Sequence, residues 1–296
     1  MNNVCFNGKL LPADTPLLRP DNKSYRYGDG LFETMRVVRG LIPLAHLHFE
    51  RLFWGLRLLD FNIPSLITRE KLQEEIRVLC KYNNCEKLAR IRLSASRGNG
   101  SIYDGSDDLQ YLIECWPLEA SGKGHGYIID IFPDARKSCD AFSNLKSANY
   151  LPYVMASRYA RHHKFDDCMV MNTHERIADA SIANIFLIKE GKLYTPPLSE
   201  GCVNGVMRRY LLEEYNGKES VITIEDMSHA DEVCLTNAVY GIRWVKQFRN
   251  KIYEHNVTSK IEAQLYKTIW RYWKNGPGYF ETRIPADGID YRNSRC

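Results

Sequence analysis

Apolar positions along the chain alternate between two periodicities, which predicts a mixture of strands and helices. Val4-Cys5-Phe6 and Lys9-Leu10-Leu11 flank Asn7-Gly8, a strong hairpin signal. Leucines recur at near-helical spacing between 45 and 60, which predicts a helix there that Pro64 terminates. Thr68 is placed to cap a second helix, because acidic residues follow it early and a lysine follows late.

The rest of the pattern predicts further strands and helices. Strands are expected at 31–38 paired with 41–44, and at 88–96, 109–116, 127–133, 167–172, 182–189, 192–195, 220–224, 232–237 and 242–248; helices are expected at 150–163, from about 205, and at 257–273. Antiparallel hairpins mixed with helices favour an α+β class over a doubly wound α/β class.

A glycine-rich stretch at 117–126 is the best candidate for an interdomain linker. We therefore expect a small N-terminal domain at 1–120 and a large domain at 125–274. The segment 275–296 lacks periodicity, and we expect an irregular tail of unassigned function there.

Composition excludes several classes of protein. The 40 basic and 36 acidic residues give a net charge of only +4, and no long basic run suggests a nucleic-acid partner. No apolar run approaches the length of a membrane span, and no secretory signal is visible. The nine cysteines include no C-x-x-C pair, so we expect reduced thiols, no metal site and a cytoplasmic location.

Two segments carry a candidate nucleophile and a candidate buried acid. Lys146 precedes an amphipathic helix, and burial there would lower its pKa and free the amine to form a Schiff base; an ordinary surface lysine is the alternative. Asp179 is embedded among small and apolar residues, where a buried carboxylate needs a cationic partner. A pyridinium nitrogen or an arginine would serve.

Two further segments carry candidate anion-binding groups. Gly205 immediately precedes a helix, whose first N–H groups and dipole favour an anion; a simple loop-to-helix junction is the alternative. Arg51 follows a Gly-Asp-Gly turn at 28–30 and lies on a helix, where its guanidinium could bind a phosphate or form a surface ion pair.

Taken in this order, the four segments resemble the class IV enzymes that depend on pyridoxal 5′-phosphate (PLP). This family includes branched-chain aminotransferases, D-amino-acid aminotransferases and aminodeoxychorismate lyases. The segments around Lys146, at 183–186 and at 195–208 carry most of the resemblance, which covers roughly 1–270. The resemblance implies PLP fold type IV, which is the D-amino-acid aminotransferase-like fold, with a small N-terminal α/β domain and a larger β-rich C-terminal domain with helices. It also implies a homodimer acting on small-molecule amino acids and keto acids.

The resemblance assigns roles to individual residues. Lys146 would hold PLP and shuttle a proton, Arg51 would bind its phosphate, and Tyr150 would hydrogen-bond its phenolic oxygen. Other implied cofactor-binding residues are Asp179, Asn184, Val203, Val206, Met207, Asn237 and Ala238. Tyr27 and Phe32 match pocket-lining positions. Arg36 and Arg97 are candidates for the substrate carboxylate, although a structural role is open for each.

Two departures from the family pattern bear on activity. Asp179 replaces the usual glutamate and is one methylene shorter, and Met207 replaces the threonine common in aminotransferases. We expect a PLP-dependent aminotransferase that uses a branched-chain-like or D-amino acid and a 2-keto acid through a Lys146 Schiff base. The stretch 203–207 is similar to that of the lyases, so the alternative function is an aminodeoxychorismate lyase that releases pyruvate and p-aminobenzoate. A non-catalytic PLP-binding protein is the third alternative.

Overall fold

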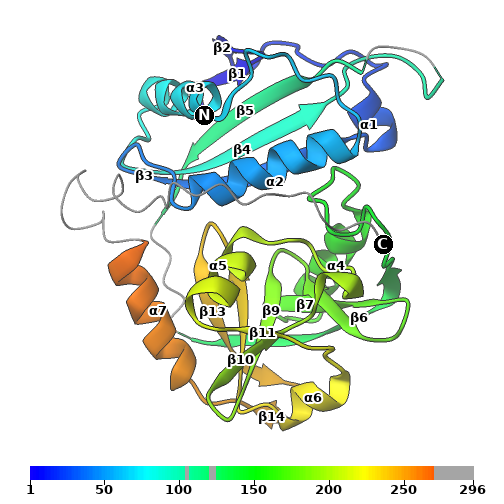
Figure 1. Ribbon diagram of the computed structural model, residues 1–296, viewed down its shortest axis with the longest axis vertical. Helices are drawn as coiled ribbons and strands as arrows, with labels where there is room; N and C mark the ends of the chain where they lie inside the picture. Colours follow the sequence, from blue (N-terminus) through cyan, green and yellow to red (C-terminus); the bar gives the residue numbers. More distant parts are fainter. Residues whose placement is uncertain (104–106, 120–124, 270–296) are drawn as a thin grey trace, which may run out of the picture.

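Two β-sheets, one formed by each half of the chain, organise the molecule (Figure 1). The computed structural model describes residues 1–103, 107–119 and 125–269. In chain order, β5 (Gln110–Pro117) is the last strand of the first sheet and β6 (Tyr127–Lys137) is the first strand of the second. The predicted linker includes 120–124, which lie outside the described residues, as does the tail at 275–296. The division into two domains stays a prediction.

The first sheet is antiparallel, with the strand order β2-β1-β5-β4-β3. Its remaining strands are β1 (Asn3–Phe6), β2 (Lys9–Pro12), β3 (Gly30–Val38) and β4 (Leu88–Ser96). The short helix α1 (Lys23–Tyr27) precedes β3, α2 (Ala45–Leu58) packs along β3, and α3 (Arg69–Tyr82) packs on β1 and β5. Apolar side chains of these elements form one buried core.

The second sheet is mixed, with the order β11-β10-β9-β12-β13-β6-β7-β8 and β14 paired to β13. Its strands after β6 are β7 (Asp167–Asn172), β8 (Ile177–Ala180), β9 (Asn184–Lys189), β10 (Lys192–Thr195), β11 (Lys218–Glu219), β12 (Glu232–Asn237), β13 (Gly241–Phe248) and β14 (Lys251–Ile252). Helix α4 (Leu151–His162) packs on β6 and β7, α5 (Val206–Glu214) on β12, and α7 (Val257–Thr268) on β12 and β13. Among the described residues, no helix combines the length and apolar character that crossing a membrane requires.

Most predicted elements are confirmed, including the first hairpin, the Thr68 cap of α3 and the strands β4, β7 and β12. Two strand predictions are wrong. The segment 41–44 forms one isolated bridge from Leu41 to Val38, because Pro43 lacks an N–H and Leu44 adopts a left-handed φ of 56°. The segment 220–224 runs instead into α6 (Ile224–His229), which Thr223 and Asp226 start with a reciprocal capping box.

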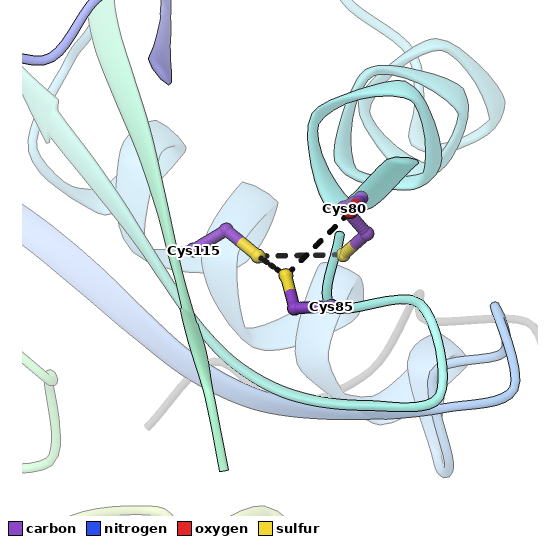
Figure 2. A group of neighbouring side chains, drawn as sticks. All are labelled: Cys80, Cys85 and Cys115. Atoms are coloured by element: carbon purple, nitrogen blue, oxygen red, sulfur yellow. Dashed lines mark hydrogen bonds between the residues drawn. The ribbon is translucent and has the colours of Figure 1, made fainter. Parts of the chain in front are cut away.

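Three thiols meet in the core of the first half of the chain, as Figure 2 shows. Cys80 lies near the end of α3, Cys85 follows that helix, and Cys115 lies on β5; Cys115 Sγ is 3.6 Å from Cys80 Sγ and 2.6 Å from Cys85 Sγ. Burial raises the pKa of Cys85 to about 12. The three cysteines belong to the buried core of this half of the chain, where thiols pack as small apolar groups.

Candidate active site

Lys146 lies where the two halves of the chain meet. The Phe32 N–H on β3 donates to the Lys146 carbonyl oxygen at 2.9 Å, and the Ala148 N–H donates to the Gly30 carbonyl oxygen at 2.8 Å. The segment that carries the lysine is thus held against the start of β3 by backbone hydrogen bonds, which fix where its side chain begins.

The Lys146 amine lies among aromatic rings and beside two arginines. Its Nζ is 4.6 Å from the centre of the Phe32 ring and 5.7 Å from that of Tyr150. Loss of hydration and the nearby Arg51 and Arg92 cations together lower the pKa of Lys146 to about 7, although the carboxylates of Glu33 and Asp179 act in the opposite direction. At neutral pH a large share of the amine is consequently unprotonated and nucleophilic.

Asp179 on β8 is the buried acid of the site, and it is only 2% exposed. Its Oδ2 accepts hydrogen bonds from Lys137 Nζ at 3.1 Å, Tyr153 Oη at 2.8 Å and the Val203 N–H at 2.9 Å. Its Oδ1 accepts from Asn184 Nδ2 at 2.8 Å. Four donors hold this carboxylate in one orientation.

Arg51 on α2 bridges the two halves through its guanidinium. Its Nε and Nη2 donate to the two Glu33 oxygens at 2.7 and 2.6 Å, and Nη1 donates to the Asn204 carbonyl oxygen at 2.9 Å. His48 Nδ1 lies 2.7 Å from Glu33. Burial alone would raise the pKa of Glu33, but Arg51 and the His48 hydrogen bond lower it to about 2. Glu33 is therefore ionised and orients Arg51.

The N-terminus of α5 lies one residue beyond Asn204. Gly205 is the N-cap, and no side chain among the described residues caps the helix. Val206 and Met207 are buried, and N–H groups in a first helical turn have no intrahelical acceptor. A Cβ on Gly205 would lie 1.8 Å from Asn184 Oδ1, so glycine is required for the helix to start this close to Asn184. This helix end favours an anion.

A second turn, after β12, lies against the loop between β8 and β9. Asn237 Oδ1 accepts from the N–H groups of Val239 and Tyr240 at 3.1 and 2.9 Å, and Asn237 Nδ2 donates to the Ile182 carbonyl oxygen at 3.4 Å. Ala238 is the next residue in this turn. Thr236 Oγ1 is buried without a partner among the described residues, so a hydrogen-bonding position is left open beside the turn.

Comparison with known proteins agrees with this arrangement. Residues 30–248 match the family described as Amino-transferase class IV. The chain belongs to this family. Enzymes of this family use PLP, and one solved structure similar to the chain is the PLP-bound form of a hypothetical aminotransferase from Mycobacterium tuberculosis (19% identity, TM-score 0.78, covering 90% of this chain and 97% of that one).

Similar proteins of known name carry different activities. An aminodeoxychorismate lyase of Bacillus subtilis is 28% identical, covering 81% of this chain and 84% of its own. A D-alanine aminotransferase of Staphylococcus haemolyticus is 25% identical, covering 80% and 86%.

Solved structures confirm the predicted fold. The Escherichia coli branched-chain amino acid aminotransferase superposes with a TM-score of 0.82 at 20% identity, covering 90% of this chain and 94% of that chain. A putative 4-amino-4-deoxychorismate lyase from Legionella pneumophila gives 0.78 at 27% identity, covering 86% and 96%. The chain therefore has the α+β fold type IV architecture.

The residues of this class IV chain fit PLP chemically. The Lys146 amine, with a pKa near 7, suits the cofactor aldehyde, and the buried Asp179 carboxylate suits the ring nitrogen. Arg51 and the uncapped N-terminus of α5 suit the phosphate. Tyr150 lies between these groups, and its hydroxyl donates to the Ser181 carbonyl oxygen at 3.3 Å. The individual cofactor-binding roles predicted from sequence remain proposals.

The predicted substrate residues are placed differently from one another. Phe32 is buried beside Lys146, and Arg36 Nη1 donates to the Val239 carbonyl oxygen at 3.1 Å. Tyr27 is 44% exposed. Arg97 is tied to Asp29 and Asp107 and to carbonyl oxygens at the end of α2, an arrangement that holds the loop after this helix.

Three residues near Lys146 and Asp179 were not anticipated from sequence: Arg92, Lys137 and Tyr153. The Arg92 guanidinium lies 3.9 Å from the centre of the Phe32 ring. A signal for Arg92 exists, because polar residues alternate along β4 with the buried Ile91 and Leu93. Lys137 and Tyr153 have no comparable signal, since each is recognised only by its contact with Asp179.

Proposed function

We propose that this protein is a PLP-dependent aminotransferase that moves an amino group between a branched-chain-like or D-amino acid and a 2-keto acid. The observation that carries the proposal is the Lys146 amine. It has a pKa of about 7, it is enclosed by Phe32 and Tyr150, and it belongs to the same connected group as Arg51 and Asp179.

The residues of the site have distinct tasks in this proposal. PLP, when bound, supplies a conjugated ring that accepts electrons from the bonds at the substrate Cα. Lys146 Nζ would take up and hold the proton lost from the substrate Cα and would later give it back, which its pKa near neutrality favours. Asp179 would accept a hydrogen bond from the ring N–H and so keep the ring nitrogen protonated. Arg51 and the N–H groups of Val206 and Met207 bind the phosphate.

The face of β3 and β4 that carries Phe32 supplies positive charge for a substrate carboxylate. Thr34 pairs with Arg92 and Arg36 pairs with Arg90 across these two strands, so the arginines share the face with Phe32. The Arg92 guanidinium stacks on the Phe32 ring. The Lys146 amine lies 4.6 Å from the centre of the same ring. We propose Arg92, with Arg36, as the carboxylate-binding residues. Arg97 is the weaker candidate because its donors are engaged elsewhere.

A half-reaction assay tests the function directly. Purified protein loaded with PLP would be mixed with a panel of L- and D-amino acids and then with 2-oxoglutarate, and keto-acid formation would be measured. We expect stoichiometric keto acid from at least one donor, and turnover when 2-oxoglutarate is added. The absence of transfer from every donor would contradict the aminotransferase assignment.

A lyase is the second candidate, because Met207 leaves the start of α5 without the threonine hydroxyl common in aminotransferases. The similarity to the Bacillus subtilis lyase supports it as well. Formation of pyruvate and p-aminobenzoate from aminodeoxychorismate, without keto-acid transfer, would establish this alternative. Retained cofactor absorbance with neither reaction would identify a non-catalytic PLP-binding protein.

We also propose a homodimer, formed in part through α4. This helix exposes Leu151, Val154 and Met155, at 66, 48 and 43%, on one stripe at helical spacing. Apolar stripes of this kind are typical of interfaces. A cytoplasmic location is proposed from the free, mostly buried cysteines among the described residues.

A further inference from the structure

Asp179 is in contact with a cation of the protein itself. Lys137 Nζ lies 3.1 Å from Asp179 Oδ2, and the two side chains are only 10% and 2% exposed. Within the described part of the chain, Lys137 is the ion-pair partner found for this carboxylate. The proposed cofactor would bring a second cation, the protonated ring nitrogen, to the same group.

The strand order explains how Lys137 reaches Asp179. Lys137 ends β6 and pairs with Asn172 on β7, while Asp179 on β8 pairs with Val170 on β7. One strand therefore separates the two residues, and the long lysine side chain spans it. The Lys137 ammonium also lies 5.2 Å from the centre of the Tyr153 ring, whose hydroxyl donates to the same Asp179 oxygen.

The contacts of Asp179 are distributed unequally between its two oxygens. Oδ2 accepts from Lys137, Tyr153 and the Val203 N–H, whereas Oδ1 accepts from Asn184 alone among the described residues. Oδ1 therefore retains the capacity to accept a further hydrogen bond. This side of the carboxylate can meet a ring nitrogen while Oδ2 stays bound to Lys137.

We propose that Lys137 is a positioning residue that serves as the resident counter-ion of Asp179, neutralising this carboxylate before the cofactor binds and sharing it with the ring nitrogen afterwards. The inference rests on the proposed role of Asp179 toward that nitrogen. A buried carboxylate without a cation is strongly destabilising, so Lys137 contributes most to the stability of the protein when no cofactor is bound. In the loaded enzyme the ring-nitrogen proton supplies part of the same compensation.

Thermal unfolding of four proteins in three states tests this proposal. The proteins are the wild type, Lys137→Met, which keeps the apolar stem, Lys137→Arg, which keeps the charge, and Lys189→Met, which removes a half-exposed lysine paired with Asp226. The states are cofactor-free, saturated with PLP, and saturated with the 1-deaza analogue of PLP, in which carbon replaces the ring nitrogen.

We expect Lys137→Met to lower the melting temperature of the cofactor-free protein by roughly 5–10 °C. PLP should recover at least about half of this loss, whereas the 1-deaza analogue should recover none, because it has no nitrogen proton to share with Asp179. Lys137→Arg should follow the wild type in all three states. Lys189→Met should change every state by about 2 °C or less.

The outcomes separate this inference from the proposed function. An equal loss in all three states would show that Lys137 supports Asp179 regardless of the cofactor, and the inference would fall while PLP binding stood. If PLP gave the wild type no visible absorbance band, the function and the inference would fall together. If Lys137→Met does not fold without cofactor, Lys137→Gln would be measured in the same way, with the same expected pattern.

Discussion

At the scale of single residues, Lys146 combines chemical reactivity with a cost in folding free energy. Its pKa in the folded protein is about 7, against 10.5 for an ordinary lysine. Between these values the unfolded chain binds more protons than the folded chain, so the stability of the cofactor-free protein rises with pH. The penalty is fully present below pH 7 and disappears as the pH approaches 10.5.

Lys146→Met should therefore stabilise the cofactor-free protein at neutral pH. We expect a gain of roughly 2–4 kcal/mol at pH 7, since each pKa unit corresponds to about 1.4 kcal/mol, and a much smaller gain near pH 10. Urea unfolding of the wild type and variant at both pH values measures it. A wild type as stable as the variant at pH 7 would contradict the reactive state assigned to this lysine.

At the scale of elements, the start of α5 links the phosphate-binding end of the site to Asp179. Gly205 lies against Asn184 Oδ1, and Asn184 Nδ2 donates both to Asp179 and to the Val203 carbonyl oxygen. Any side chain at position 205 must displace Asn184. The helix start and the carboxylate are thus positioned by the same amide.

Gly205→Ala should weaken PLP binding by roughly 10- to 100-fold, because the new methyl group would displace Asn184 and shift the first turn of α5. Fluorescence titration of the cofactor-free protein with PLP measures the affinity. Gly191→Ala is the matched control, since nothing lies within 4 Å of its added Cβ and its φ of 72° brings only local strain. Unchanged PLP affinity in Gly205→Ala would refute this role of the helix start.

The sequence predicts elements better than it predicts their junctions. Periodicity and caps locate α2, α3, β4 and β7, because local signals determine these elements. The strand predicted at 220–224 fails because the Thr223 capping box starts a helix that the apolar run conceals. Helix α1 and strand β8 are too short to give a periodic signal.

The site is predictable only where a family motif marks it. Lys146, Arg51 and Asp179 lie in such motifs; Arg51 and Asp179 are linked through hydrogen bonds to the backbone at 203–204, and the Lys146 amine lies close enough to both for their charges to affect its pKa. Lys137 and Arg92 approach the site through strand pairing, and no local pattern encodes which strands become neighbours. The cluster of Cys80, Cys85 and Cys115 is not predictable from the sequence for the same reason, since the packing of α3 on β5 brings the three thiols together (Figure 2).

At the scale of the whole molecule, Lys146 stands where the two sheets meet, so their relative placement controls the site. Hydrogen bonds from Phe32 and Arg51 reach across to the Lys146 and Asn204 carbonyl oxygens, and an ion pair joins Glu50 to Arg209 at 2.6 Å. Helix α4 begins at Leu151, soon after Lys146, and leaves its apolar stripe exposed.

The combined variant Leu151→Glu, Met155→Glu should abolish the proposed homodimer and give a monomer, because each carboxylate would be desolvated in the interface. Light scattering after size-exclusion chromatography measures the mass. Leu66→Glu changes an even more exposed leucine, at 74%, between α2 and α3 and should leave the mass unchanged. A double variant that stays dimeric would exclude α4 from the interface.

The most direct test of the central claim is to trap the cofactor on the chain. The protein would be saturated with PLP, reduced with borohydride, digested and mapped by mass spectrometry, with Lys146→Ala treated in parallel. We predict a stable PLP adduct on the peptide containing Lys146 and loss of the visible absorbance band in the variant. An adduct on another lysine, or the same absorbance band in Lys146→Ala, would contradict the assignment of Lys146 as the residue that holds the cofactor.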